Sequence, residues 1–392
     1  MAPGAIVLCL NGGSSSLKLA LFQLGDSERM LGSGAVEGIG QASARLWLRD
    51  ATGKQVAESS ANLTDHAAAV QALFDALATQ SWPVPSAVGH RLVHGGPDYA
   101  EPVRVDHALL EALRKLVPYA PLHLPAELAI VEAVSKRYPK LPQVVCFDTA
   151  FHRAMPELAR RLPLPRELYD AGIRRYGFHG LSYEYIVHAL AAEGQGRLVV
   201  AHLGSGASMA AIHNGQSLDT TMSFTPTGGI MMATRSGDLD PGVLLHLQRE
   251  RGYDTARLTQ LVEHDAGLRG VSGGTSDMET LLENRATDPH AAEAVALFCY
   301  LVKKQIGAYA AVLGGIDTLM FTGGIGEHAA FVRETACAGL AYLGIEINPP
   351  RNHANAPMIS RTGGRCTVRV LATDEERMIA RHTRELLFPH PI

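Results

Sequence analysis

Residues 6–22 read IVLCLNGGSSSLKLALF, in which two runs of β-forming residues flank a turn of Gly and Ser. Residues 198–212 read LVVAHLGSGASMAAI and repeat this pattern. Aligning the two segments places Gly12 on Gly204 and Ser16 on Ser208, with apolar residues on both sides. The repetition indicates that the chain consists of two related halves.

A turn of Gly and small hydroxyl residues between strands can direct backbone N–H groups and Ser hydroxyls at one point, which suits a phosphate group. Ordinary hairpin turns have the same composition, so neither turn alone distinguishes the two interpretations. The pairing of the turns, together with Lys18 and His202, favours a polyphosphate bound by two domains.

The chain has 392 residues, of which 46% are hydrophobic, and a formal net charge of −4. This length exceeds the size of a single hydrophobic core and predicts two domains of roughly 150 to 220 residues. No run of Lys and Arg is longer than two residues. The charge pattern therefore gives no sign of nucleic-acid or membrane-surface binding.

Five scattered cysteines without CxxC spacing indicate the reduced thiols of a cytoplasmic protein. The N-terminus lacks a basic segment followed by a long apolar stretch, so we expect no export signal. Residues 291–313 form the most apolar helical segment, but Glu293, Lys303 and Lys304 interrupt it. This segment is predicted to be a buried core helix rather than a membrane span.

Strand-like and helical segments alternate along the chain, which indicates an α/β fold with a mixed sheet. Strands are expected at residues 6–10, 17–23, 87–90, 142–147, 198–203, 208–213 and 318–322, and helices near 65–78 and 126–137. Asp148 follows one of these strands, at the kind of position where α/β sites gather. The segment 220–240 is too long for a simple connector and is predicted to be functional.

Two arginines are stronger candidates for ligand binding than any histidine. Arg91 and Arg235 lie among Gly, Ser and Thr, and a guanidinium fork matches a carboxylate or a phosphoryl oxygen pair. A single His in a tight motif is more often structural. His90 and His94 have the spacing of helical metal ligands, but neighbouring glycines argue against a helix there and no third ligand is evident.

Seven motifs, taken in order, make the chain resemble the acetate kinase family, which belongs to the superfamily of acetate and sugar kinases, Hsp70 and actin. The motifs are residues 11–18, 89–96, 147–152, 176–180, 234–242, 321–327 and 373–376. The resemblance implies two duplicated ribonuclease-H-like (actin-like ATPase) domains with a cleft between them. Residues 1–148 and about 377–392 would form the first domain. Residues 149–376 would form the second, which would bind nucleotide and form a homodimer.

The resemblance also implies an activity. It is the reversible, direct in-line transfer of the γ-phosphoryl group of ATP to acetate, giving acetyl phosphate and ADP. The reaction would need Mg²⁺, for which Mn²⁺ can substitute, and would take place in the cytoplasm. An acetate carboxylate is already ionised at neutral pH, so no general base is required. The difficulty is to bring two anions together, which calls for positioning and charge stabilisation.

The family's functional residues carry over position by position. The catalytic group comprises Arg91, Asp148, His179 and Arg235. The acyl site comprises Arg91, Val93, Leu122, Phe178 and Pro226, and the metal site Asn11, Asp148 and Glu375. The nucleotide and phosphate site comprises Asn11, Ser14, Ser16, Lys18, His123, His202, Leu203, Gly204, Ser205, Gly206, Asp277, Met278, Glu279, Gly323, Gly324, Ile325 and Gly326.

Several positions depart from the usual family pattern: Leu124, Ser205, Thr227, Gly228, Glu279, His328 and Asp374. Glu279, where an Arg is usual, bears on the choice of phosphoryl donor. Three alternative functions remain open. The chain could be a propionate or broad short-chain acyl kinase, a nucleotide-dependent conformational protein of the Hsp70 or actin type, or a metal-dependent hydrolase that uses the histidines.

Overall fold

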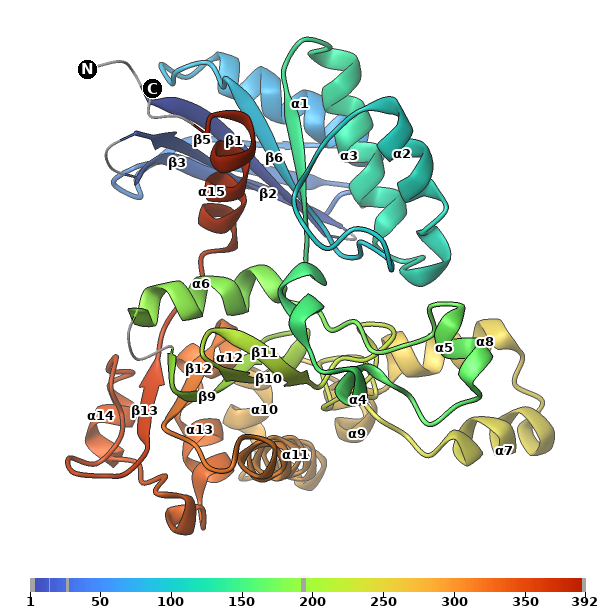
Figure 1. Cartoon of the computed structure of the whole chain (residues 1–392), viewed down its shortest axis with the longest axis vertical. Helices are drawn as coiled ribbons and strands as arrows, with labels where there is room; N and C mark the ends of the chain where they lie inside the picture. Colours follow the sequence, from blue (N-terminus) through green and yellow to red (C-terminus); the bar gives the residue numbers. More distant parts are fainter. Residues whose placement is uncertain (1–3, 14, 26–27, 192–194, 390–392) are drawn as a thin grey trace. The chain divides into compact units, whose positions relative to one another are not determined.

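The computed structural model describes residues 4–13, 15–25, 28–191 and 195–389, so the predicted phosphate-binding residue Ser14 lies outside the described residues (Figure 1). The chain divides into two compact units. Unit 1 comprises Met1–Ala150 and Asp374–Ile392, and unit 2 comprises Phe151–Thr373. The sequence places the domain boundaries after residues 148 and 376, whereas the structure divides the chain after residues 150 and 373.

Unit 1 contains an eight-stranded sheet in the order β5-β4-β3-β2-β1-β6-β8-β7. Its strands are β1 (Ala5–Gly12), β2 (Ser16–Leu24), β3 (Glu28–Glu37), β4 (Ala44–Asp50), β5 (Gln55–Ala61), β6 (Ala87–Leu92), β7 (Val103–Arg104) and β8 (Gln143–Phe147). Its helices are α1 (His66–Ala78), α2 (His107–Arg114), α3 (Leu124–Arg137) and α15 (Glu375–Leu387).

Helices cover both faces of the centre of this sheet, so β1 reads as an almost continuous apolar run. On one face, Leu8 and Leu10 belong to a core that also contains Val70 of α1 and Ile130 of α3. On the other face, α15 packs against β1, β2, β6 and β8 (Figure 1). A Cβ on Gly89 would lie 2.4 Å from the hydroxyl oxygen of Thr383, so glycine is what lets α15 approach β6.

Unit 2 contains a five-stranded sheet in the order β11-β10-β9-β12-β13. Its strands are β9 (Arg197–Leu203), β10 (Ala207–His213), β11 (Gln216–Thr220), β12 (Thr318–Thr322) and β13 (Thr367–Val370). Its helices are α4 (Glu157–Arg160), α5 (Arg166–Asp170), α6 (Gly180–Leu190), α7 (Pro241–Arg251), α8 (Thr255–Gln260), α9 (Gly267–Ser272), α10 (Met278–Asn284), α11 (Pro289–Leu313), α12 (Gly323–His328), α13 (Ala330–Cys337) and α14 (Pro349–His353).

The strand topology confirms the internal duplication that the two turns predict. In unit 1, β1 pairs antiparallel with β2 and parallel with β6. In unit 2, β9 pairs antiparallel with β10 and parallel with β12. The order β3-β2-β1-β6-β8 therefore corresponds to β11-β10-β9-β12-β13. Both Gly/Ser turns close antiparallel hairpins, so the hairpin interpretation and the phosphate interpretation do not exclude each other.

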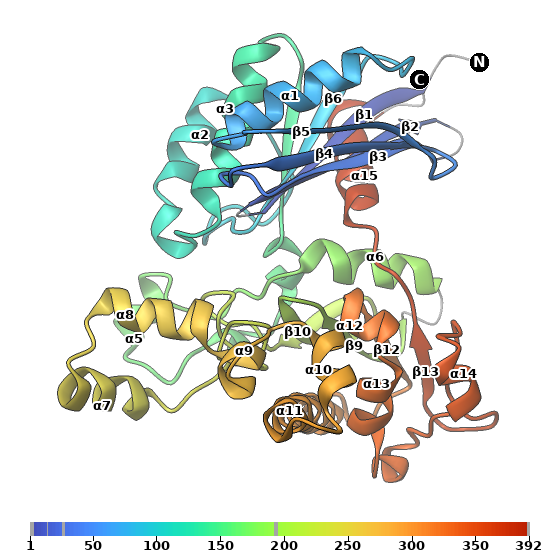
Figure 2. The ribbon, with the colours of Figure 1, turned by 180° about the vertical axis from the view of Figure 1, so that it is seen from behind.

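The sheet of unit 2 lies between α6 and α11 (Figure 2). Tyr183 and Ile186 of α6 share a core with Val200 of β9 and Met320 of β12. Helix α11 packs against β9, β10 and β11. The hydroxyl of Tyr309 on α11 donates to the Met209 carbonyl oxygen at 3.3 Å.

Helix α11, which the sequence predicts to be a buried core helix, is buried along one face and exposes part of its surface. Phe298 and Val302 lie on its buried face, but Leu297, Tyr300 and Val312 of the same helix are exposed. By length and composition alone α11 could also cross a membrane, a test that core helices of globular proteins also pass. The sequence of the helix does not show which of its apolar residues find partners within the unit.

The predicted long segment is confirmed, since no helix or strand lies between β11 and α7 in this fully described stretch. The segment folds back on itself. The Asp238 N–H donates to the Gly229 carbonyl at 2.8 Å, and the Gly229 N–H donates to the Asp238 carboxylate at 2.7 Å. Gly237 has φ +72°, and a Cβ there would lie 2.5 Å from the Gly229 carbonyl oxygen. These contacts give the part of the segment that carries Arg235 a defined backbone.

Candidate functional site

The predicted residues of unit 1 gather at the carboxyl ends of three neighbouring strands. Asn11 of β1 lies beside Arg91 of β6 in parallel register. Strand β6 in turn runs parallel to β8, which Asp148 follows directly. Because parallel strands end at the same edge of a sheet, residues 57 or more positions apart in sequence come together there.

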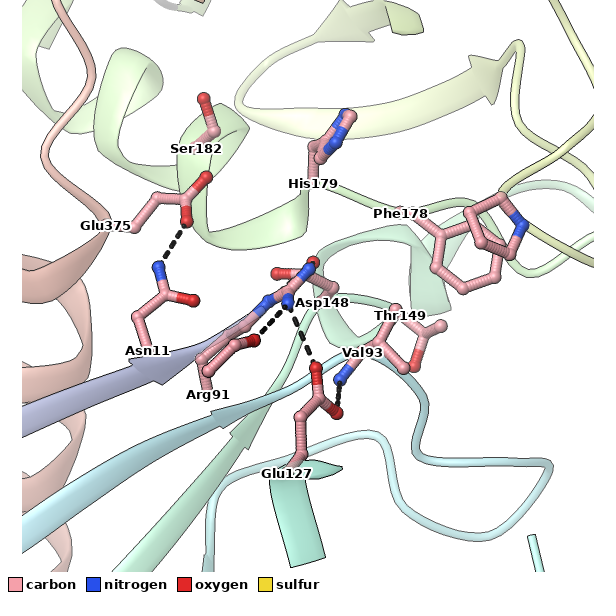
Figure 3. Close-up of polar contacts among 12 residues, drawn as sticks. Asn11, Arg91, Val93, Glu127, Asp148, Thr149, Phe178, His179, Ser182 and Glu375 are labelled. Atoms are coloured by element: carbon pink, nitrogen blue, oxygen red, sulfur yellow. Dashed lines mark hydrogen bonds and ion pairs between the residues drawn. The ribbon is translucent and has the colours of Figure 1, made fainter. Parts of the chain in front are cut away.

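Carboxylates hold the Arg91 side chain. Its Nη2 and Nε both donate to Oδ2 of Asp148, the latter at 3.0 Å, and its Nη1 donates to Oε1 of Glu127 at 3.0 Å (Figure 3). Burial by itself would lower the pKa of Arg91, but the charges of Asp148 and Glu127 outweigh it and raise that pKa. Arg91 is therefore a permanent, oriented cation.

Glu127 is a functional candidate that the sequence reasoning missed. It projects from α3, is only 2% exposed, and also accepts the Val93 backbone N–H at 2.8 Å (Figure 3). Burial raises the pKa of Glu127 to about 7, although Arg91 and the Val93 N–H oppose the shift. The sequence could have revealed Glu127 through its position among Leu124, Leu128 and other apolar residues of α3. A carboxylate buried among apolar residues needs a hydrogen-bonding or charged partner.

The predicted metal-site residues have a donor set that suits a hard cation. Asn11 Nδ2 donates to Oε2 of Glu375 at 3.0 Å and to Oε1 of Glu376 at 3.3 Å. Oδ1 of Asp148 is buried and has no hydrogen-bond partner among the described residues. Burial and the nearby charge of Asp148 raise the pKa of Glu375. A bound divalent cation would satisfy the Asp148 oxygen and relieve this repulsion.

Within the described parts of the chain, no group of three His, Cys, Asp or Glu side chains forms a metal site by itself. Mg²⁺ usually binds one or two carboxylates and keeps several waters. The oxygens of Asp148, Glu375 and Asn11 would suit a Mg²⁺ ion that keeps some of its water ligands.

The other predicted residues of unit 1 lie nearby in the fold. Lys18 is exposed on β2, opposite Asn11 across the hairpin, and the Ser16 carbonyl accepts the Gly13 N–H at 2.8 Å. His123 is half-buried at the start of α3, and Leu122 is exposed beside it. Val93 is buried directly after β6.

The remaining histidine motif of unit 1 has a structural explanation. Nε2 of His90 bonds to Oε1 of Gln143 at 2.7 Å, and Nδ1 of His94 accepts the Gly96 N–H at 2.8 Å. Burial lowers the pKa of His90 to about 4, so its ring is neutral. These contacts favour the structural role that is usual for a single histidine.

In unit 2, His179 has an unusual backbone. It lies at the start of α6 with φ +59°, a left-handed conformation that is uncommon for a non-glycine residue and often marks a functional position. Its Nδ1 bonds to the Ser208 hydroxyl at 2.7 Å, and Ser208 also bonds to the Tyr183 hydroxyl. With Ser208 as donor to Nδ1, the Tyr183–Ser208–His179 chain leaves the proton of a neutral ring on Nε2.

A second histidine, His202, packs against His179. The His202 ring stacks on that of His179, with centroids 4.4 Å apart, and its Nδ1 bonds to the Ser182 hydroxyl at 2.8 Å. The sequence selects His202, but it does not select Ser182, Tyr183 or Ser208 as site residues. In the sequence, Ser208 stands out only as the counterpart of Ser16 in the repeated turn.

Arg235 and His179 converge on the second Gly/Ser turn. A Cβ on Gly206 would lie 3.5 Å from Nε2 of His179 and 3.6 Å from Nη1 of Arg235. That Arg235 nitrogen donates to the Pro226 carbonyl oxygen at 3.2 Å. Phe178, next to His179 in sequence, is buried and its carbonyl bonds to Nε2 of His152 at 3.0 Å. The structure thus brings together four predicted residues of unit 2, namely His179, Gly206, Pro226 and Arg235.

A cavity of about 780 Å³ lies next to this turn, within the size range of small-molecule sites. Seven predicted nucleotide-binding residues line it: Gly204, Ser205, Asp277, Met278, Glu279, Gly324 and Ile325. Five others do not line it: His202, Leu203, Gly206, Gly323 and Gly326. The lining also includes Glu283 and His328, so carboxylates are prominent in its wall.

Two of these residues have evident structural roles. Gly323 has φ +77°, and a Cβ there would lie 2.7 Å from the Leu203 carbonyl oxygen, so only glycine allows β12 to turn so close to β9. Asp277 accepts the Thr280 N–H at 2.9 Å as the N-cap of α10. That bond lowers the pKa of Asp277.

Comparison with known proteins gives a consistent result. A model of the acetokinase family matches residues 6–381. A protein of Rhizobium meliloti named acetate kinase is 45% identical, and the match covers 97% of this chain and 98% of that protein. The crystal structure of Porphyromonas gingivalis acetate kinase matches with a TM-score of 0.88 at 38% identity, covering 98% of this chain and all of that one. A propionate kinase from Francisella tularensis matches with a TM-score of 0.90 at 33% identity, covering 97% of this chain and 99% of that one.

Proposed function

The chain belongs to the acetokinase family, and from this we propose that it is an acetate kinase, which reversibly transfers the γ-phosphoryl group of ATP to acetate and gives acetyl phosphate and ADP. The observation that carries the proposal is Arg91, a cation oriented by Asp148 and Glu127 beside the buried Val93. A protein that only switches with nucleotide has no need of such an anion site in addition to a nucleotide cavity.

The reaction mainly requires positive charge around the transferred phosphoryl group. The acetate oxygen attacks the γ-phosphorus in line while the bond from that phosphorus to the ADP oxygen breaks, and no proton has to move. Arg91, His179 and Arg235 are the donors that we assign to the phosphoryl oxygens. Asp148 orients Arg91 through Oδ2. Mg²⁺, or Mn²⁺ in its place, would neutralise phosphate charge when held by Asp148, Glu375 and Asn11.

The nucleotide is assigned to unit 2. We infer that the cavity lined by Gly204, Ser205, Met278, Gly324 and Ile325 takes the nucleoside of ATP. Ser16, Lys18, His123 and His202 are assigned to the phosphates by their family positions. The proposed setting is the cytoplasm, where ATP is available and the five cysteines, all unpaired and buried, remain reduced.

The exposed face of α11 supports a homodimer formed through unit 2. Leu297, Tyr300 and Val312 are apolar side chains exposed at the surface of that helix. Apolar patches of this kind often mark protein interfaces. Analytical ultracentrifugation would test the proposal, and a monomer at all concentrations would refute it.

One assay tests the proposed function against its alternatives. The purified chain with ATP, Mg²⁺, acetate and hydroxylamine should form acetohydroxamate, because hydroxylamine traps acetyl phosphate. ATP turnover that does not respond to acetate would instead indicate a nucleotide-dependent conformational protein. Hydroxamate formation with propionate or butyrate at higher kcat/KM than with acetate would reassign the substrate within the same family.

Propionate is the runner-up substrate because a propionate kinase is among the structural matches. We expect Val93→Ala to raise the ratio of propionate to acetate kcat/KM by roughly tenfold, on the lower side of what one methylene is worth. The backbone bond from Val93 to Glu127 does not depend on the side chain and should survive. Val56→Ala, at an exposed position of β5, is the matched control. Equal ratios in parent and Val93→Ala would show that Val93 does not line the acyl pocket.

Glu279 bears on the phosphoryl donor. It lines the nucleoside cavity where relatives usually carry an arginine, and Glu283 adds a second carboxylate. A guanidinium that stacks on a purine contributes about 0.5 to 2 kcal/mol, whereas a carboxylate can accept hydrogen bonds from the amino group of guanine. We expect the parent to accept GTP as well as ATP, and Glu279→Arg to raise the preference for ATP by about 2- to 30-fold.

The donor prediction is checked by kinetics with ATP, GTP and pyrophosphate on the parent and the variant. Glu283→Arg is the comparison, because it makes the same change of charge at a different position of the same cavity. A strict preference for ATP in the parent that Glu279→Arg leaves unchanged would show that Glu279 points to solvent and has no role in donor choice.

A further inference from the structure

Glu127 links two parts of the proposed acyl site, the guanidinium of Arg91 and the backbone of Val93. Its Oε1 accepts from Nη1 of Arg91 at 3.0 Å and its Oε2 accepts from the Val93 N–H at 2.8 Å (Figure 3). Both acceptors belong to one rigid carboxylate on α3, a 14-residue helix. The distance between the guanidinium and the Val93 peptide is therefore set by a single group.

Packing alone does not explain a charge at this position. Leu124, Leu128 and Val131 on the same face of α3 are buried apolar residues, and Glu127 is as buried as they are. A buried ion pair is often no more stable than apolar residues of similar volume, so stability is a weak reason for its presence. The specific geometry that it imposes on Arg91 is a better reason.

The contacts of Arg91 determine which of its N–H groups remain for a ligand. Nε and one Nη2 hydrogen are directed to Asp148, and one Nη1 hydrogen to Glu127. The second Nη1 hydrogen has only a long contact, 3.4 Å, to the Gly12 carbonyl oxygen. The second Nη2 hydrogen has no acceptor among the described residues. Without Glu127 the guanidinium could rotate about Asp148, and its outward donors would no longer have a fixed direction.

We propose that Glu127 is a positioning residue for the acyl substrate. It fixes the outward donors of Arg91 relative to the peptide of Val93, and so sets the angle at which a short carboxylate presents its oxygen and its alkyl group. The inference rests on the proposed function, since it assigns the carboxylate to Arg91 and the alkyl group to Val93. Glu127 acts through these two residues and need not touch the substrate.

The proposal predicts a separation of kinetic constants. Misplacement of a reacting group by about 1 Å can cost about 10²-fold in rate, so Glu127→Ala should lower kcat for acetate by roughly 10- to 100-fold. The KM for ATP should stay within about threefold of the parent value, because the nucleotide cavity belongs to unit 2. Discrimination between acetate and propionate should also weaken, since the Val93 peptide loses its anchor.

Glu127→Gln tests the two contacts separately and guards against a variant that does not fold. A glutamine has one acceptor oxygen, so it can satisfy either Arg91 or the Val93 N–H but not both. The expected order of kcat is Glu, then Gln, then Ala. Glu132→Gln is the control, because Glu132 lies on the exposed side of α3, where it pairs with Arg114. It should leave kcat and specificity unchanged.

A double-mutant cycle tests whether Glu127 acts through Arg91. In an Arg91→Ala background, Glu127→Gln should have little further effect on kcat, because the group it positions is gone. If the losses from the two changes instead multiply, or if Glu127→Gln keeps the kcat and specificity of the parent, the inference is wrong. A parent protein that forms no acyl phosphate would refute the proposed function itself, which keeps the two failures distinct.

Discussion

The variants Arg91→Ala and Arg235→Ala are each expected to lower kcat by roughly 10³-fold or more, the scale reported for arginines that stabilise a transferring phosphoryl group. Hydrogen bonds orient both guanidinium groups: Arg91 donates to Asp148 and Glu127, and Arg235 donates to the Pro226 carbonyl oxygen. Steady-state hydroxamate kinetics measure the loss. A variant of either residue with near-normal turnover would contradict its assigned role.

The stabilities of these two variants should differ. Arg91→Ala leaves the buried carboxylates of Asp148 and Glu127 without their counter-charge, a change that costs about 3 to 5 kcal/mol in comparable pairs. Arg235 is half-buried and donates to the Pro226 carbonyl oxygen and the Met232 sulfur, so we expect Arg235→Ala to lower the Tm less than Arg91→Ala does.

Thermal unfolding measured beside kcat separates the two effects. Arg45→Ala is a suitable control, because Arg45 forms exposed pairs with Glu37 and Glu58 on the outer strands of unit 1. It should change neither kcat nor Tm appreciably, since exposed ion pairs contribute about 0 to 1 kcal/mol. Arg235→Ala then tests mainly the effect on catalysis. Arg91→Ala also tests how much the buried ion pairs of Arg91 with Asp148 and Glu127 contribute to stability.

Glu375→Ala is expected to act mainly through the metal. A carboxylate that binds Mg²⁺ supplies a direct oxygen ligand, so its loss should weaken metal binding by at least the roughly 10- to 100-fold that removal of an outer partner causes. The Mg²⁺ concentration for half-maximal activity should rise by that factor. Calorimetric titration with Mn²⁺ in the absence of substrates gives a readout that does not depend on turnover.

Glu376→Ala is the matched control for the metal prediction. Asn11 contacts both carboxylates, but the contact to Glu376 is longer, 3.3 Å against 3.0 Å. Burial and the charge of Asp148 raise the pKa of Glu375, which lies beside Glu376 in the first turn of α15. If both variants keep the metal dependence of the parent, Glu375 is an ordinary residue at a helix start.

Local pattern was enough to predict much of the fold and a large part of the candidate site. The strands at 6–10 and 198–203 were predictable because buried central strands are almost continuous apolar runs. The repeated turns predicted the duplication, and Gly204 and Ser205 line the cavity expected beside the second turn. Each of these inferences depends on residues within a few positions of one another.

The sequence by itself therefore determined the α/β class, the two related halves and most of the residue types available for binding an anion. Only the tertiary structure decided that Glu127 holds Arg91, that Ser208 orients His179, and that one face of α11 stays exposed. The physical reason is that burial and pairing of a polar group depend on partners far away in the chain. Asn11 and Glu375, which share a hydrogen bond, are 364 positions apart, and no local periodicity records that contact.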